Sequence, residues 1–67
     1  MSIQDQVNSS MEAATLNGYE FHQWRFSEVA EDLVLCDSDL EDVPTEELVP
    51  MIKEWYKNSD VTYEIWE

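Results

Sequence analysis

The chain has 67 residues, of which 16 are Asp or Glu and 3 are Lys or Arg, so its formal net charge is −13. A chain of this length is expected to form a single domain, residues 1–67, with a small core, because it buries only about 60% of its unfolded surface. Hydrophobic residues make up 43% of the chain, which favours a folded domain over a disordered one. Binding to nucleic acid or to an anionic membrane requires a basic patch, so we expect neither as a direct partner.

Three features of the sequence bear on the cellular location. No apolar run approaches the roughly 20 residues of a membrane span, and residues 1–10 lack the basic and apolar pattern of a signal peptide. The single cysteine excludes an internal disulfide, which is typical of proteins in a reducing compartment. These features predict a cytoplasmic protein.

The first predicted element is a helix over residues 3–16. Ser2 begins a variant of the capping box, and apolar residues then recur at helical spacing. Gly18 can close this helix at its C-terminal end. The Asn-Ser-Ser sequence of residues 8–10 is poor in helix formers, so an edge strand or a frayed arm remains an alternative.

Two segments alternate between apolar and polar residues, which predicts strands. Residues 19–25 are rich in aromatic side chains, and residues 61–66 (VTYEIW) alternate over their whole length. The alternation directs Trp24 and Trp66 to the sheet face opposite the core. There they would either form a contact patch or cover the N-terminal segment.

Two further helices are predicted between these strands. The first covers residues 28–36 with Ser27 as its N-cap, and its apolar residues can line one face. The second follows Thr45 as a cap and carries an apolar stripe at i, i+4 and i+7. Pro50 conflicts with this second helix, so we expect either a kink at the proline or a helix that begins there.

These elements predict a small α+β domain, in which two helices pack on one face of an antiparallel sheet of two or three strands. Cys36 is expected in the core as a small residue, and His22 on the strand surface. The remaining core is predicted from periodic apolar positions: Phe21, Val29, Leu33, Leu48, Ile52, Trp55, Val61, Tyr63 and Ile65.

The negative charge is concentrated in one stretch, residues 28–47, which contains no Lys or Arg. We call this stretch the acidic block, and its acids are Glu28, Glu31, Asp32, Asp37, Asp39, Glu41, Asp42, Glu46 and Glu47. A block of one sign indicates an interaction face, since a small domain needs only about 2 to 8 charges for solubility. A very soluble surface or a halophilic source remains the alternative explanation.

Carboxylates on a rigid helix can stand in for the phosphates of DNA. Acids at i, i+3 and i+4, such as Glu28, Glu31 and Asp32, are separated by about 4.5 to 6 Å along a helix axis. Phosphates along one DNA strand are separated by about 3.4 Å of axis. The acidic block therefore predicts a partner with a cationic DNA-binding site, and its nine acids are the predicted contact residues.

The sequence offers little for catalysis or metal binding. Asp37-x-Asp39-x-Glu41 begins like a calcium loop, but the positions that require Gly and a bidentate Glu hold Asp42 and Leu48. His and Cys occur once each, without a visible orienting group. We therefore predict a protein that is not an enzyme, with no catalytic residue, cofactor, metal or small-molecule substrate. Loose binding of divalent cations by the acids remains an alternative.

Two short motifs carry a resemblance to a known family: Gly18-Tyr19-Glu20-Phe21 and Val43-Pro44-Thr45, with Val49 and Met51 at similar positions. Over roughly residues 18–55 the chain resembles a family of type I-F anti-CRISPR proteins, small acidic phage proteins of the DNA-mimic kind. The resemblance implies a small sheet with two helices. It also implies blockade of a CRISPR surveillance complex at the basic site that receives DNA, in the cytoplasm of an infected bacterium. That family begins with a strand, where the pattern here predicts a helix.

The leading hypothesis is a DNA-mimic inhibitor of anti-CRISPR or anti-restriction type. The runner-up is an antitoxin or immunity protein that neutralises a basic nuclease, because residues 48–57 (LVPMIKEWYK) resemble a helix of nuclease immunity proteins. A structural accessory subunit is the third possibility. Gene neighbourhood would separate the first two, since a phage operon indicates an inhibitor and an adjacent toxin gene indicates immunity.

Overall fold

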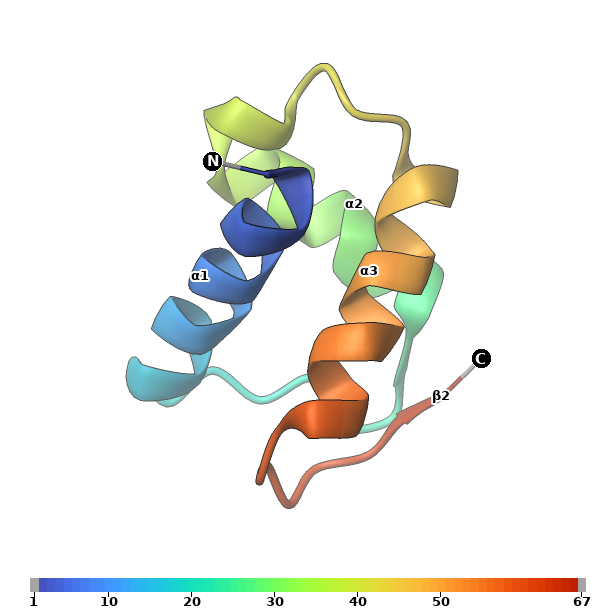
Figure 1. The fold of residues 1–67 in the computed structure, drawn as a ribbon. Coiled ribbons are helices and arrows are strands. Elements are labelled where there is room, and N and C mark those ends of the chain that lie inside the picture. Colours follow the sequence, from blue (N-terminus) through green and yellow to red (C-terminus); the bar gives the residue numbers. More distant parts are fainter. Residues whose placement is uncertain (1, 67) are drawn as a thin grey trace.

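The computed structural model describes residues 2–66, which form a mostly helical α+β fold (Figure 1). The elements in chain order are α1 (Ile3–Leu16), β1 (Trp24–Arg25), α2 (Phe26–Cys36), the 3-10 helix η1 (Ser38–Leu40), α3 (Thr45–Asn58) and β2 (Ile65–Trp66). α1 and α3 run in the same direction, and α2 lies behind them in this view and runs the opposite way (Figure 1). No helix in this described part is long and apolar enough to cross a membrane.

α1 confirms the predicted N-terminal helix. The Oγ atom of Ser2 accepts a hydrogen bond from the backbone N–H of Asp5 at 3.1 Å, which satisfies a free donor of the first turn. Val7 and Met11, one helical turn apart, are fully buried. Gly18 follows the helix with φ of +80°, a left-handed conformation that favours glycine.

The predicted strands are wrong over most of their length, and so is the antiparallel sheet. Within residues 2–66, only Trp24–Arg25 and Ile65–Trp66 form strands, and they pair in parallel with Trp24 opposite Ile65. The chain between them passes through α2 and α3, and a connection of this kind can return the second strand in the direction of the first. The alternation in the predicted strands instead reflects aromatic packing, since the rings of Phe21 and Tyr63 lie 6.2 Å apart.

The starts of α2 and α3 differ from the prediction. Arg25 occupies the N-cap of α2, so Ser27 lies inside that helix. Pro44 occupies the N-cap of α3, and Thr45 is the first residue of the helix rather than its cap. No side chain of residues 2–66 donates or accepts a capping hydrogen bond at this helix start. α3 continues through Pro50, so the predicted start at this proline is wrong. A kink at Pro50 stays a prediction.

One hydrophobic core joins the three helices to the aromatic segments. The prediction is confirmed for Phe21, Val29, Leu33, Leu48, Ile52, Tyr63 and Ile65, which are all buried. Trp55 and Val61 are only partly buried against this core. The buried residues that the prediction missed are Val7, Met11, Phe26, Ala30 and Leu40.

Three single residues also test the predicted burial. His22 is exposed, as predicted. Cys36 is exposed rather than buried, because it ends α2 at the edge of the core. Trp24 is half-buried and packs against the core, with its ring 5.3 Å from that of Phe21, so its predicted orientation away from the core is wrong.

Candidate acidic interface

The structure divides the acidic block into two groups. Glu28, Glu31 and Asp32 lie on α2. The other acids lie at one end of the molecule, where α2 ends, η1 follows and α3 begins (Figure 1). We call the exposed acids of this end the acidic pole: Asp39, Glu41, Asp42, Glu46 and Glu47.

The turn that carries the acidic pole is tied to the protein interior. Leu40, the last residue of η1, is only 1% exposed and anchors the turn in the core. The backbone N–H of Leu40 donates to the Asp37 carbonyl at 3.1 Å, and that of Val43 donates to the Leu40 carbonyl at 3.0 Å. These contacts give its carboxylates a defined position.

Glu46 and Glu47 stand in the first turn of α3. The N-terminal end of a helix carries a partial positive charge, because its first N–H groups lack partners within the helix. The two carboxylates are therefore favoured there even though other acids lie close by. Both side chains are exposed and accessible to a partner.

Asp37 has a structural role that separates it from the acidic pole. Its carboxylate accepts hydrogen bonds from the Ser10 hydroxyl, from Nε2 of Gln6 at 2.6 Å and from the backbone N–H of Asp39 at 3.0 Å. The bonds from Ser10 and Gln6 are the main causes that hold the pKa of Asp37 below its ordinary value. The side chain joins α1 to η1, so much of its hydrogen-bonding capacity is already used by the fold.

The acids of α2 are less uniformly available. Glu28 and Glu31 are exposed, whereas Asp32 is half-buried. The Cys36 thiol lies 3.8 Å from Oδ2 of Asp32. Although the residue is exposed, partial desolvation of the thiol and the nearby Asp32 carboxylate raise its pKa, so it stays protonated and weakly nucleophilic at neutral pH. Within residues 2–66, no three His, Cys, Asp or Glu side chains are grouped to hold a metal ion.

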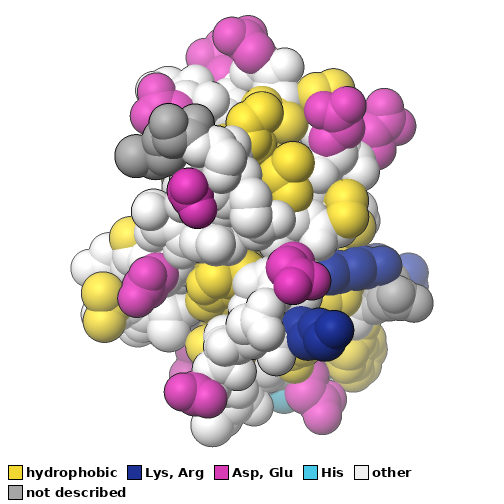
Figure 2. All heavy atoms as spheres, in the orientation of Figure 1, with side chains coloured by type: hydrophobic (Ala, Val, Ile, Leu, Met, Phe, Trp, Pro, Cys, Tyr) yellow, Lys and Arg dark blue, Asp and Glu magenta, His cyan; other side chains and the backbone are white. Residues whose placement is uncertain are grey.

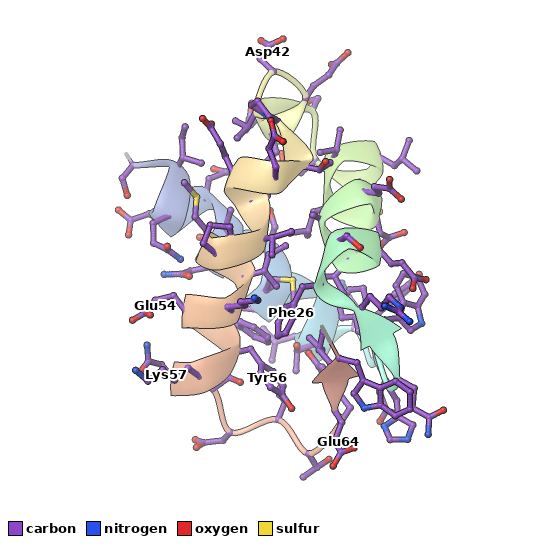
Figure 3. All side chains as sticks on the ribbon, turned by 90° about the vertical axis from the view of Figure 1, so that its right-hand side faces the viewer. Phe26, Asp42, Glu54, Tyr56, Lys57 and Glu64 are labelled. Carbon is purple, nitrogen blue, oxygen red and sulfur yellow. The ribbon has the colours of Figure 1, made fainter. Side chains whose placement is uncertain are left out.

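The basic residues lie away from the acidic pole. On the face shown in Figure 2, Lys and Arg gather in the lower half, while acids lie at the upper end and also across the lower half. Lys53 lies over the ring of Phe26, with Nζ at 5.4 Å from the centroid. Figure 3 shows Lys57 toward the opposite end from Asp42. The described Lys and Arg residues therefore lie away from the acidic pole, whereas acids also occur in the half of the molecule that carries these cations.

No family model, curated protein or solved structure matches the chain. Function is therefore inferred from the surface described above. The sequence located the acidic pole, because its members are close in the chain, but it missed the structural role of Asp37. The Asp37-Ser38-Asp39 sequence was a usable signal only for the bond to the Asp39 N–H, since an Asp before a turn commonly accepts the N–H two residues later, whereas the bonds from Ser10 and Gln6 depend on the fold.

Proposed function

We propose that the protein is a non-enzymatic inhibitor that binds the cationic DNA-binding site of a bacterial defence complex and presents carboxylates in place of phosphates. The observation that supports this proposal is the acidic pole, whose exposed acids are held on a hydrogen-bonded turn anchored by Leu40. A CRISPR surveillance complex is the proposed target, and an anti-restriction role belongs to the same class of activity.

Local charge density is the physical basis of the proposed binding. Exposed carboxylates attract a basic partner over roughly 8 to 10 Å at moderate salt, which raises the association rate. Arg side chains of the target would then form bidentate hydrogen bonds with individual carboxylates. The acidic pole suits this role better than the acids of α2, because all of its members are exposed and Asp32 is half-buried.

The decisive experiment is charge reversal at the acidic pole. In the triple variant Glu41→Lys, Asp42→Lys and Glu46→Lys, inhibition of DNA binding by a purified type I-F surveillance complex should weaken by about 100-fold or more, since each hydrogen bond to a charged group contributes about 1.5 to 3 kcal/mol. The matched control reverses three exposed acids outside the acidic block: Asp5→Lys, Glu54→Lys and Glu64→Lys.

The control changes the net charge by the same amount, so it separates a local interface from a general charge effect. We expect the control to lose less than about tenfold in affinity. Circular dichroism must show that both variants are folded. Equal inhibition by the parent and the folded pole variant would contradict the proposal. If the parent inhibits no DNA-binding complex but neutralises a basic nuclease through the same acids, an immunity function replaces the proposed inhibitor function.

A further inference from the structure

A groove lies between the C-terminal parts of α1 and α3, at the opposite end of the molecule from the acidic pole. Its volume is about 690 Å³, and residues 59–63, which follow α3, also line it. A smaller cavity of about 320 Å³ extends the groove along the two helices to Gln4 and Glu54, and it shares the lining residues Asn8, Trp55, Asn58 and Ser59. The proposed function uses none of this surface.

Aromatic side chains form part of the groove. Tyr19, Trp55 and Tyr63 line it, and Tyr19 is 45% exposed. Tyr63 is held in place by a hydrogen bond of 3.2 Å between its hydroxyl and that of Thr15. Its carbonyl also accepts a bond from the Tyr56 hydroxyl at 3.0 Å. Tyr63 is itself buried and fixes the floor of the groove, so the aromatic surface open to a ligand comes from Tyr19 and the half-buried Trp55.

The rim of the groove is negatively charged. Glu12, Glu20 and Asp60 line it and are exposed, and no Lys or Arg from the described part of the chain lines it. Lys53 and Lys57 project from the other side of α3, as their helical spacing from Trp55 requires. α1 and α3 both end beside the groove, and C-terminal helix ends carry partial negative charge.

We infer that this groove binds an arginine side chain presented by an extended segment of a protein partner. A guanidinium is planar and weakly hydrated, so it stacks on aromatic faces while its five N–H groups donate to carboxylates and carbonyls. The groove supplies both kinds of contact, and its exposed Leu16 offers an apolar contact to a neighbouring residue of the segment. The inference goes beyond the proposed function and does not rest on it.

The first test uses the capped peptide acetyl-Gly-Arg-Leu-Gly-amide, titrated into the full chain and followed by amide and indole NMR shifts. We expect saturable shifts at Gly18 and at the Trp55 indole, with none at Asp42. The same peptide with citrulline in place of arginine keeps the shape but lacks the charge, and it should bind at least tenfold more weakly. A third peptide carries lysine in place of arginine, and equal binding of this peptide would overturn the choice of arginine.

The second test separates the groove from the overall charge. The variant Glu12→Gln, Glu20→Gln and Asp60→Asn should weaken peptide binding by about tenfold or more. The matched variant Glu41→Gln, Asp42→Asn and Glu46→Gln removes as much charge from the acidic pole and should change binding less than about twofold at 0.15 M salt.

All six of these side chains are exposed, so neither variant removes a core contact. Equal losses in the two variants would overturn the inference, because they would show attraction by the net charge alone. Groove shifts that appear with rising protein concentration and no peptide would also overturn it, since a second copy of the chain would then be the occupant.

Discussion

The two ends of the molecule are stabilised in different ways. At the end that carries the acidic pole, Leu40 is buried and Asp37 connects the turn to α1 by hydrogen bonds. At the other end, Phe21 packs against neighbouring rings, with centroids 5.0 Å from Tyr19 and 5.3 Å from Trp24. The difference shows how a highly charged surface is built on a small core. At the acidic pole, hydrogen bonds and the buried Leu40 fix the turn, whereas aromatic packing stabilises the opposite end.

The largest expected effect comes from removing the apolar anchor of each end. Phe21→Ala should destabilise the protein by about 3 to 5 kcal/mol and Leu40→Ala by about 2 to 5 kcal/mol, because both side chains are buried. Either loss is a large part of the free energy of unfolding of a typical domain, which is about 5 to 15 kcal/mol. Urea unfolding followed by circular dichroism measures both.

Leu35→Ala is the matched control for Leu40→Ala, since Leu35 is 86% exposed. Its substitution should change the free energy of unfolding by less than about 0.5 kcal/mol. Equal effects at the two leucines would show that the turn of the acidic pole lacks the apolar anchor described here.

A smaller effect is expected from Asp37→Asn, which removes the charge that Ser10 and Gln6 contact. We expect a loss of about 1 to 2 kcal/mol at pH 7 in urea unfolding. The folded-state pKa of Asp37 is lowered, so its contribution is present above the unfolded pKa of about 3.9 and is lost as pH falls through the folded value. The gap between parent and variant should therefore narrow below pH 4.

Protonation of the other acids at low pH also relieves repulsion, so the difference between parent and variant is the informative quantity. Asp42→Asn serves as the control, because that side chain is exposed on the acidic pole. A gap between the parent and Asp37→Asn that stays constant from pH 7 to pH 3 would contradict the role of Asp37 as a charged tie.

The smallest effects concern the backbone near the aromatic end. Gly18→Ala should cost about 1 kcal/mol from the positive φ of +80° alone, because an added Cβ would meet no atom within 4 Å.

Gln23 also has a positive φ, of 66°, without being glycine. Gln23→Gly relieves that strain but loosens the unfolded chain, so the net change should stay within about 0.5 kcal/mol. Thermal unfolding measures both variants, and a larger loss for Gln23→Gly than for Gly18→Ala would contradict this prediction.

The helices could be predicted because their signals are local. A cap at Ser2 and apolar residues at helical spacing specify α1 without knowledge of the rest of the chain. The strands could not be predicted in the same way, since the pairing of Trp24 with Ile65 depends on the path of two helices between them. The aromatic alternation was real, but it served packing around Phe21 rather than a ladder of hydrogen bonds.

The candidate sites differ in the same respect. The acidic pole lies in one continuous stretch, so its charge is visible in the sequence, although its separation from the acids of α2 is not. The groove draws its lining from α1, α3 and the segments around Tyr19 and Val61, which are distant in the chain. Only the folded arrangement brings Glu12, Glu20 and Asp60 to one rim.

The parallel pair of β1 and β2 has a consequence for folding kinetics. Trp24 and Ile65 lie roughly 40 residues apart, and closing a loop of that length costs conformational entropy before any contact offsets it. The packing of α2 against α3 closes a much shorter loop and is expected to form earlier. Docking of β2, which brings Tyr63 against Phe21, is then a late step. A protein assembled in this order would expose its aromatic cluster to solvent during most of its folding time, while the acids surrounding it oppose association with other chains.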